Sequence, residues 1–116
     1  GLLVANQTAL TARHLAAIGA QDVPVGIAGM QDQREFREVM LQGQRAELDV
    51  DQLEREVLSV VDGLANDHPD LGALVIECTD LVPFAQPIQQ RLGLPVFDIV
   101  TLSTMVHATL CRQRYG

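Results

Sequence analysis

Short apolar runs alternate along the chain with longer segments in which apolar residues recur at helical spacing. Runs of the first kind predict buried strands at residues 1–5, 23–28, 71–77 and 94–97. The helical spacing predicts helices at residues 8–18, 33–42, 49–66, 83–93 and 98–114. Strands that alternate with helices are typical of a parallel α/β sheet. We therefore expect a single α/β domain over residues 1–116, with a four-stranded parallel sheet and helices on both faces.

Ligands of such sheets bind beyond the carboxyl ends of the strands, so polar residues at those ends are the candidates for a site. Cys78 is the sharpest of them, because it directly follows an apolar strand and precedes a predicted helix. Free backbone N–H groups at a helix start would lower the pKa of a thiol there, and they could also hold a substrate carboxylate. A buried, inert cysteine fits the same position equally well.

The neighbours of Cys78 have two readings each. Thr79 would bind a ligand or cap the next helix, and Asp80 would be a site residue or a helix cap. Glu77 points to the opposite face of the strand and would be a site carboxylate or a structural acid paired with a helix residue, and we favour the structural interpretation. After the first strand, Asn6 and Thr8 would bind a carboxylate or act as a cap.

The predicted last helix carries His107 and Cys111, which we interpret as packed side chains. Asp98 and Thr101 stand where this helix begins, and starting it is a sufficient role for both.

Composition and charge narrow the function further. Fifteen acidic residues oppose eight basic ones, for a net charge of -7, and the basic residues are scattered, so we expect no binding to nucleic acid. No run approaches the ~20 apolar residues of a membrane helix, so we expect no membrane partner. The two cysteines have no metal-ligand spacing, so we expect no metal and a reducing, cytoplasmic setting.

The segment GALVIECTDLVPFAQPIQQRLGLPVFDIVTL, residues 72–102, resembles the second-domain signature of the aspartate/glutamate/hydantoin racemase superfamily. The most similar branch reads Glu-Cys-Thr-Asn, then Pro-aromatic-Ala, then Gly-Leu-Pro-Val-Phe-Asp. These motifs correspond here to residues 77–80, 83–85 and 93–98. The opening GLLVANQTAL also looks like the strand that begins the family's second domain.

The resemblance implies the C-terminal half of a racemase made of two similar α/β domains, each with one cysteine facing a shared cleft. Cys78 would be the second cysteine, inverting an amino acid or hydantoin by acid-base chemistry without a cofactor. Asn6, Thr8 and Thr79 would grip the substrate carboxylate, and His107 would assist. Asp80 departs from the family's Asn, and no first domain with its own cysteine is present in the sequence.

Two other functions fit the same residues. One is an arylmalonate-decarboxylase-like enzyme, in which a single cysteine protonates a carbanion. The other is an inactive domain that serves only in self-association. In each case we expect the chain to form a homo-oligomer, because a half domain exposes apolar surface. A homodimer would, on one hypothesis, set two copies of Cys78 across one cleft.

Overall fold

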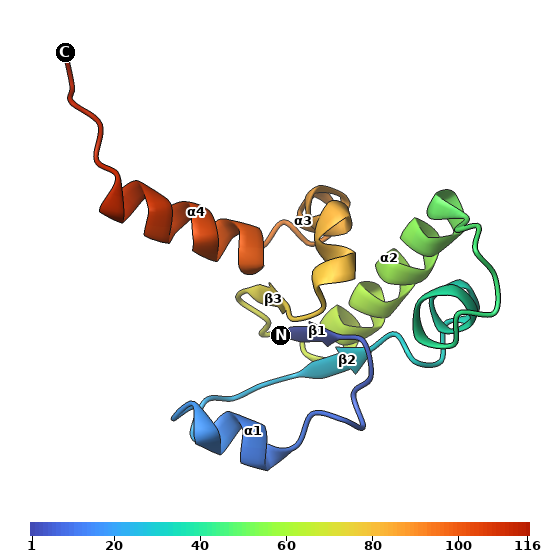
Figure 1. Cartoon of the computed structure of the whole chain (residues 1–116). Coiled ribbons are helices and arrows are strands. Elements are labelled where there is room, and N and C mark those ends of the chain that lie inside the picture. Colours follow the sequence, from blue (N-terminus) through green and yellow to red (C-terminus); the bar gives the residue numbers. More distant parts are fainter.

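A computed structural model describes residues 1–116 and contains a four-stranded sheet whose strands are all parallel (Figure 1). The strand order is β2-β1-β3-β4. The strands are β1 (Leu2–Val4), β2 (Ile27–Gly29), β3 (Leu74–Ile76) and β4 (Val96–Phe97). The predicted class and sheet are confirmed, although each strand is shorter than its apolar run.

Six helical segments complete the fold. They are α1 (Ala12–Ala17), the π-helix η1 (Phe36–Leu41), α2 (Val50–Asp67), the 3₁₀-helix η2 (Thr79–Phe84), α3 (Ala85–Leu92) and α4 (Ile99–Leu110). No helix of the structure is both long and apolar enough to cross a membrane.

Local chemistry sets several helix boundaries. The Asp49 carboxylate accepts the backbone N–H of Gln52 at 2.9 Å and so starts α2. Gly93 ends α3 with a φ of 65°, which a glycine adopts without strain. Pro83 has no N–H to donate, and the segment that contains it winds as the 3₁₀-helix η2 before α3 begins.

The first helix has two candidate caps in the sequence, Thr8 and Thr11, and the structure uses Thr11, so α1 begins at Ala12 and not at residue 8. The Asn6 side-chain oxygen accepts the backbone N–H of Thr8 at 3.0 Å and the Thr8 hydroxyl at 2.7 Å. This local turn competes with helix formation, as Asn side chains often do. The segment after β1 is therefore a loop.

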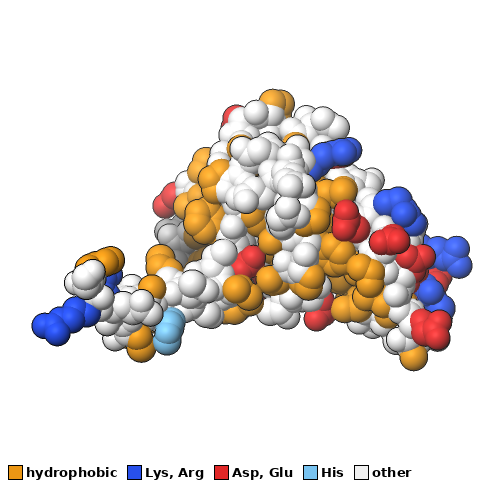
Figure 2. All heavy atoms as spheres, turned by 90° about the horizontal axis from the view of Figure 1, so that it is seen from above, with side chains coloured by type: hydrophobic (Ala, Val, Ile, Leu, Met, Phe, Trp, Pro, Cys, Tyr) orange, Lys and Arg blue, Asp and Glu red, His pale blue; other side chains and the backbone are white.

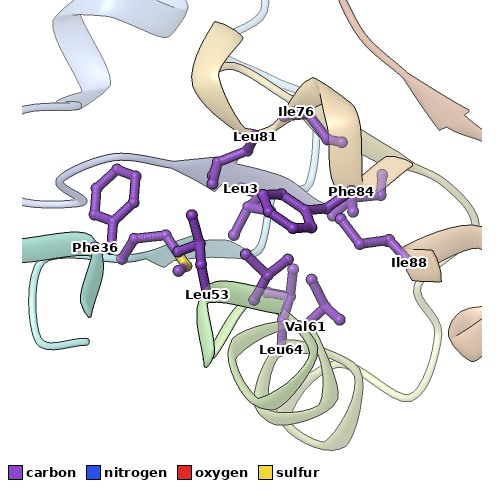
Figure 3. Packing of buried hydrophobic residues seen from close by; sticks show 12 residues of the cluster. Leu3, Phe36, Leu53, Val61, Leu64, Ile76, Leu81, Phe84 and Ile88 are labelled. Atoms are coloured by element: carbon purple, nitrogen blue, oxygen red, sulfur yellow. The ribbon is translucent and has the colours of Figure 1, made fainter. Parts of the chain in front are cut away.

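The hydrophobic core lies between one face of the sheet and helices α2 and α3 (Figure 3). Leu3 and Ile76 point from the sheet toward Leu53 and Val61 of α2 and Ile88 of α3, and all five are at most 3 % exposed. Burying one such side chain stabilises the fold by about 1.5–3 kcal/mol. This face of the sheet is fully covered.

A polar network ties η1 to α2 at the edge of this core. The Glu56 carboxylate accepts the backbone N–H groups of Glu35 at 2.8 Å and Phe36 at 3.1 Å. Glu35 in turn pairs with Arg45 at 2.7 Å and accepts the N–H of Asp49 at 2.8 Å. The two buried acids are thus satisfied, and they fix the connector between the two helices.

The opposite face of the sheet is only partly covered. A right-handed crossover places α1 on this face and α2 and α3 on the other, and Figure 1 shows α1 on its own side of the strands. No residue of α1 is buried. Val75 and Phe97, which point to this face, remain 39 % and 52 % exposed. Helices lie on both sides, as expected, but the second side has unfilled apolar surface.

Helix α4 projects from the body of the molecule (Figures 1 and 2). Every residue from 99 to 116 is exposed. The radius of gyration is 15.7 Å, whereas a chain of this length folded into one compact body has about 13.4 Å. The projecting helix and the six residues that follow it, 111–116, form an arm.

Candidate functional site

Three of the polar strand ends lie side by side at one edge of the sheet. Strand β3 pairs with β1 on one side and with β4 on the other, all parallel. Their carboxyl ends therefore meet at the same edge. The structure brings together the loop that contains Asn6, the Cys78 turn after β3 and Asp98 after β4.

Cys78 occupies the capping position before η2 and is half-buried, with its side chain packed against the core. Burial raises the pKa of the Cys78 thiol, and the negative charges of Asp80 and Glu77 raise it further. The backbone N–H groups of Asp80 and Leu81 favour the thiolate but do not outweigh burial. The predicted lowering of this pKa is therefore wrong. The N–H groups of a short 3₁₀ turn stabilise the thiolate by less than desolvation destabilises it.

The other predicted site residues differ in whether their side chains already form hydrogen bonds within the chain. Thr79 and Asp80 are exposed next to Cys78. Asn6 and Thr8 bond to one another, so their side chains are engaged in the loop after β1. Whether any of these four residues binds substrate stays a prediction.

Asp98 is a helix cap, as its position in the sequence suggested. It is buried, and its carboxylate accepts the backbone N–H of Thr101 at 2.9 Å. The Thr101 hydroxyl in turn accepts the Asp98 N–H at 3.0 Å. This reciprocal pair fixes the start of α4 beside the site.

Glu77 is exposed, and the four ion pairs of the chain use other acids. The helix partner expected for it is not found. Glu77 is instead one of the residues that line a groove of about 470 Å³ between the uncovered sheet face and α4. The rest of the lining is mostly apolar and includes Val75, Phe97, Leu102 and Met105.

Sequence reasoning missed this groove. The signal for it was the second apolar set of β3 and β4, at Val75 and Phe97, which alternates with the core residues.

His107 and Cys111 lie outside the site. Both are exposed, so the interpretation of packed side chains is wrong. His107 comes nine residues after Asp98 on a straight helix, which is about 13 Å along the axis. The structure thus does not bring His107 to Cys78, and it shows no group of three or more His, Cys, Asp or Glu side chains suited to a metal ion.

Comparisons with known proteins give two similar relatives. The chain is 30% identical over 91 residues to a dimethylsulfoniopropionate lyase of Durusdinium sp. clade D. The aligned segment covers 78% of this chain and 29% of the relative. It is 31% identical over 61 residues to dimethylsulfoniopropionate lyase 5 of Emiliania huxleyi (strain CCMP1516), covering 53% of this chain and 12% of that relative. No family model and no solved structure matches. The chain therefore spans less than a third of the curated relatives it matches.

These names correct the functional expectation drawn from the sequence. Both relatives are named as lyases, whereas the motifs around Cys78 led us to expect a racemase of the aspartate/glutamate/hydantoin superfamily. The racemase assignment and the arylmalonate decarboxylase alternative are both wrong on this finding. A racemase inverts a carbon centre and keeps its substrate intact, and an arylmalonate decarboxylase releases CO₂ from a malonate, whereas both relatives are named for dimethylsulfoniopropionate. The names of both relatives thus point to an enzyme of another class than a racemase.

Proposed function

We propose that the chain is part of a lyase that acts on dimethylsulfoniopropionate or a similar carboxylate with a leaving group on its β-carbon, and that Cys78 is the base. The relatives' names support the substrate class. The position of Cys78 at the carboxyl end of the central strand pair supports the role of the residue.

The reaction requires one base, positioned at the α-carbon of the substrate. Dimethylsulfoniopropionate carries a sulfonium group on the carbon β to its carboxylate. The Cys78 thiolate would remove a proton from the α-carbon, and the electron pair left behind would form the double bond as the β-carbon–sulfur bond breaks. The products are acrylate and dimethyl sulfide, and the proton stays on the cysteine sulfur. Because the sulfur leaves as a neutral thioether, the leaving group needs no acid.

The surroundings of Cys78 suit a base that acts on a weakly acidic carbon. Burial raises the pKa of the thiol, so its conjugate thiolate is a stronger base than that of an exposed cysteine. The sulfur is only half-buried, which leaves it within reach of a small substrate. Thr79 and Asp80, which follow it, are exposed, and the backbone N–H of Asp80, which favours the thiolate, would face the developing negative charge.

The test is release of dimethyl sulfide by the 116-residue chain. Headspace gas chromatography would measure dimethyl sulfide, and NMR would measure acrylate in the same sample. We expect both products in equal amounts from the chain. Cys78→Ala and Cys78→Ser should reduce the rate by about 10²–10⁴, the usual contribution of a positioned base.

Cys111→Ala is the matched control, because Cys111 is the second free cysteine and lies outside the site. It should keep the full rate. Equal losses in the Cys78 and Cys111 variants, or dimethyl sulfide release that survives Cys78→Ala, would contradict the role given to Cys78. No product over a range of pH, from the chain or from a longer protein that contains it, would contradict the proposed activity.

A further inference from the structure

We propose that two copies of the chain pair through α4 and the groove beside it, and that Arg112 and Arg114 of each copy bind the substrate carboxylate at Cys78 of the other. The second part rests on the proposed function. The first part stands on the surface of the molecule alone.

The arm is too apolar for a segment that remains in water. Seven of the fourteen large apolar side chains that are exposed lie between Phe97 and Leu110. Met105 is 61 % exposed, Leu102 is 51 % exposed, and α4 contains no Asp, Glu, Lys or Arg. Contiguous exposed apolar surface of this kind marks a contact with another protein surface.

The groove offers a matching surface. Its lining combines the uncovered strand residues Val75 and Phe97 with Ile99, Leu102 and Met105 of α4. An amphipathic helix binds such a groove through side chains three and four residues apart. The α4 helix of a second copy presents that spacing, so one surface would serve both sides of a two-fold contact.

Charge distinguishes a second copy from other occupants. The site at the start of α4 has exposed Glu77 and Asp80, whereas the far end of α4 leads into exposed Arg112 and Arg114. Neither arginine forms an ion pair within the chain. Figure 2 shows the basic side chains at the tip of the arm, away from the body. If two α4 helices pack antiparallel, the basic end of each lies at the acidic end of the other.

The site also lacks a cation of its own. The charges that act on the Cys78 thiol are those of Asp80 and Glu77, both negative. Cys78 packs against the core and is not part of the groove lining, which includes its neighbour Glu77. The groove lining has no arginine, and the other candidate ligands, Asn6, Thr8 and Thr79, are neutral. A substrate carboxylate at Cys78 would meet Glu77 and Asp80 and no positive charge. Arginines from the second copy would supply the missing cation.

This arrangement differs from a cleft shared by two cysteines. The starts of two antiparallel α4 helices lie at opposite ends of the pair, and twelve residues of helix span about 18 Å. Each Cys78 would thus serve its own site, with arginines from the other copy.

Sedimentation equilibrium of the 116-residue chain tests the pairing. We expect twice the chain mass at micromolar concentration. Leu102→Glu combined with Met105→Glu should leave a folded monomer by circular dichroism, and Arg112→Glu combined with Arg114→Glu should raise the dimer Kd about tenfold. Adding Glu77→Arg and Asp80→Arg to the second pair should restore the dimer. Ile18→Glu, at an exposed apolar residue that follows α1, is the control and should change nothing.

A chain that is monomeric at all concentrations would overturn the pairing. The apolar surface of α4 and the groove would then be a contact for another polypeptide, such as the additional part of the chain that the longer relatives have. A dimer that survives Leu102→Glu with Met105→Glu, or an open-ended series of larger assemblies, would overturn it as well. These readouts do not depend on activity, so they separate failure of the pairing from failure of the proposed function.

Mixing two inactive variants tests the role of the arginines. Cys78→Ala copies and Arg112→Ala/Arg114→Ala copies should each release little dimethyl sulfide. When they exchange freely, half of the dimers are mixed and each holds one intact site, so about a quarter of the parent activity should return. No recovery in an exchanged mixture, with an active parent chain, would overturn the role in trans.

Discussion

Two acidic neighbours influence the pH at which Cys78 can act as a base. Burial raises the pKa of the thiol most, and the carboxylates of Asp80 and Glu77 add to the rise because they oppose a second negative charge nearby. An acid whose pKa is raised loses its proton at higher pH. The fraction of thiolate, and with it the proposed elimination, should therefore increase as pH rises past neutrality.

Asp80→Asn should move this dependence toward lower pH. The substitution removes one of the charges that raise the Cys78 pKa and keeps the size of the side chain, so the thiolate forms earlier. The measurement is kcat/KM for dimethyl sulfide release against pH, which reports ionisation in the free enzyme. Asp70→Asn, at an exposed acid in the turn after α2, is the control. A profile of Asp80→Asn that overlays the parent's would show that another group governs the pH dependence.

At the scale of elements, α2 contributes a polar contact to η1 as well as apolar side chains to the core. Through Glu56 it also supplies the acceptor for two N–H groups at the start of η1, and those groups have no other partner in the structure. Buried donors that lose their acceptor are strongly destabilising. The contact between α2 and η1 is thus polar as well as apolar.

Glu56→Ala should lower the free energy of unfolding by about 2–4 kcal/mol, because two buried N–H groups lose a charged acceptor. Glu56→Gln keeps one acceptor oxygen and should lose less. Urea unfolding followed by circular dichroism gives both values. Glu54→Ala, on the same helix but outside the network, should stay within about 0.5 kcal/mol of the parent. If Glu56→Ala unfolds at the same urea concentration as the parent, water replaces the lost acceptor and the network adds no stability.

The elements that sequence reasoning predicted best are those with a local signal. Asp49 at the start of α2 and Gly93 at the end of α3 act through their own backbone neighbourhood, so their letters suffice. The first helix starts after Thr11 and not after Thr8 because Asn6 and Thr8 form a turn, and the sequence alone suits either start. The exposure of Cys111 and His107 depends on where α4 points, which periodicity does not report.

At the scale of the whole molecule, the arm dominates the shape. The longest dimension is 50 Å against 35 and 27 Å for the others, and the arm accounts for the large radius of gyration. The parallel sheet and its edge of polar strand ends followed from the sequence. The uncovered sheet face and the groove did not follow from the sequence, because they exist only where no helix packs against the sheet.

Small-angle scattering of the monomeric Leu102→Glu/Met105→Glu variant should give a radius of gyration near 15.7 Å. The two new charges keep α4 from folding onto the apolar sheet face, so the arm should stay extended. A value near 13.4 Å, that of a compact chain of this length, would mean that α4 closes over the groove in the single chain.

The different settings of the two cysteines also determine how the protein responds to thiol chemistry. Alkylating agents and peroxide react with thiolates, and Cys78 holds its proton to higher pH because it is half-buried beside two acids. Cys111 is fully open to solvent at the end of α4. Mild reagents at neutral pH will therefore modify the arm first and leave the proposed base untouched. Partial labelling of this chain thus reports on α4 and says nothing about whether the site is blocked.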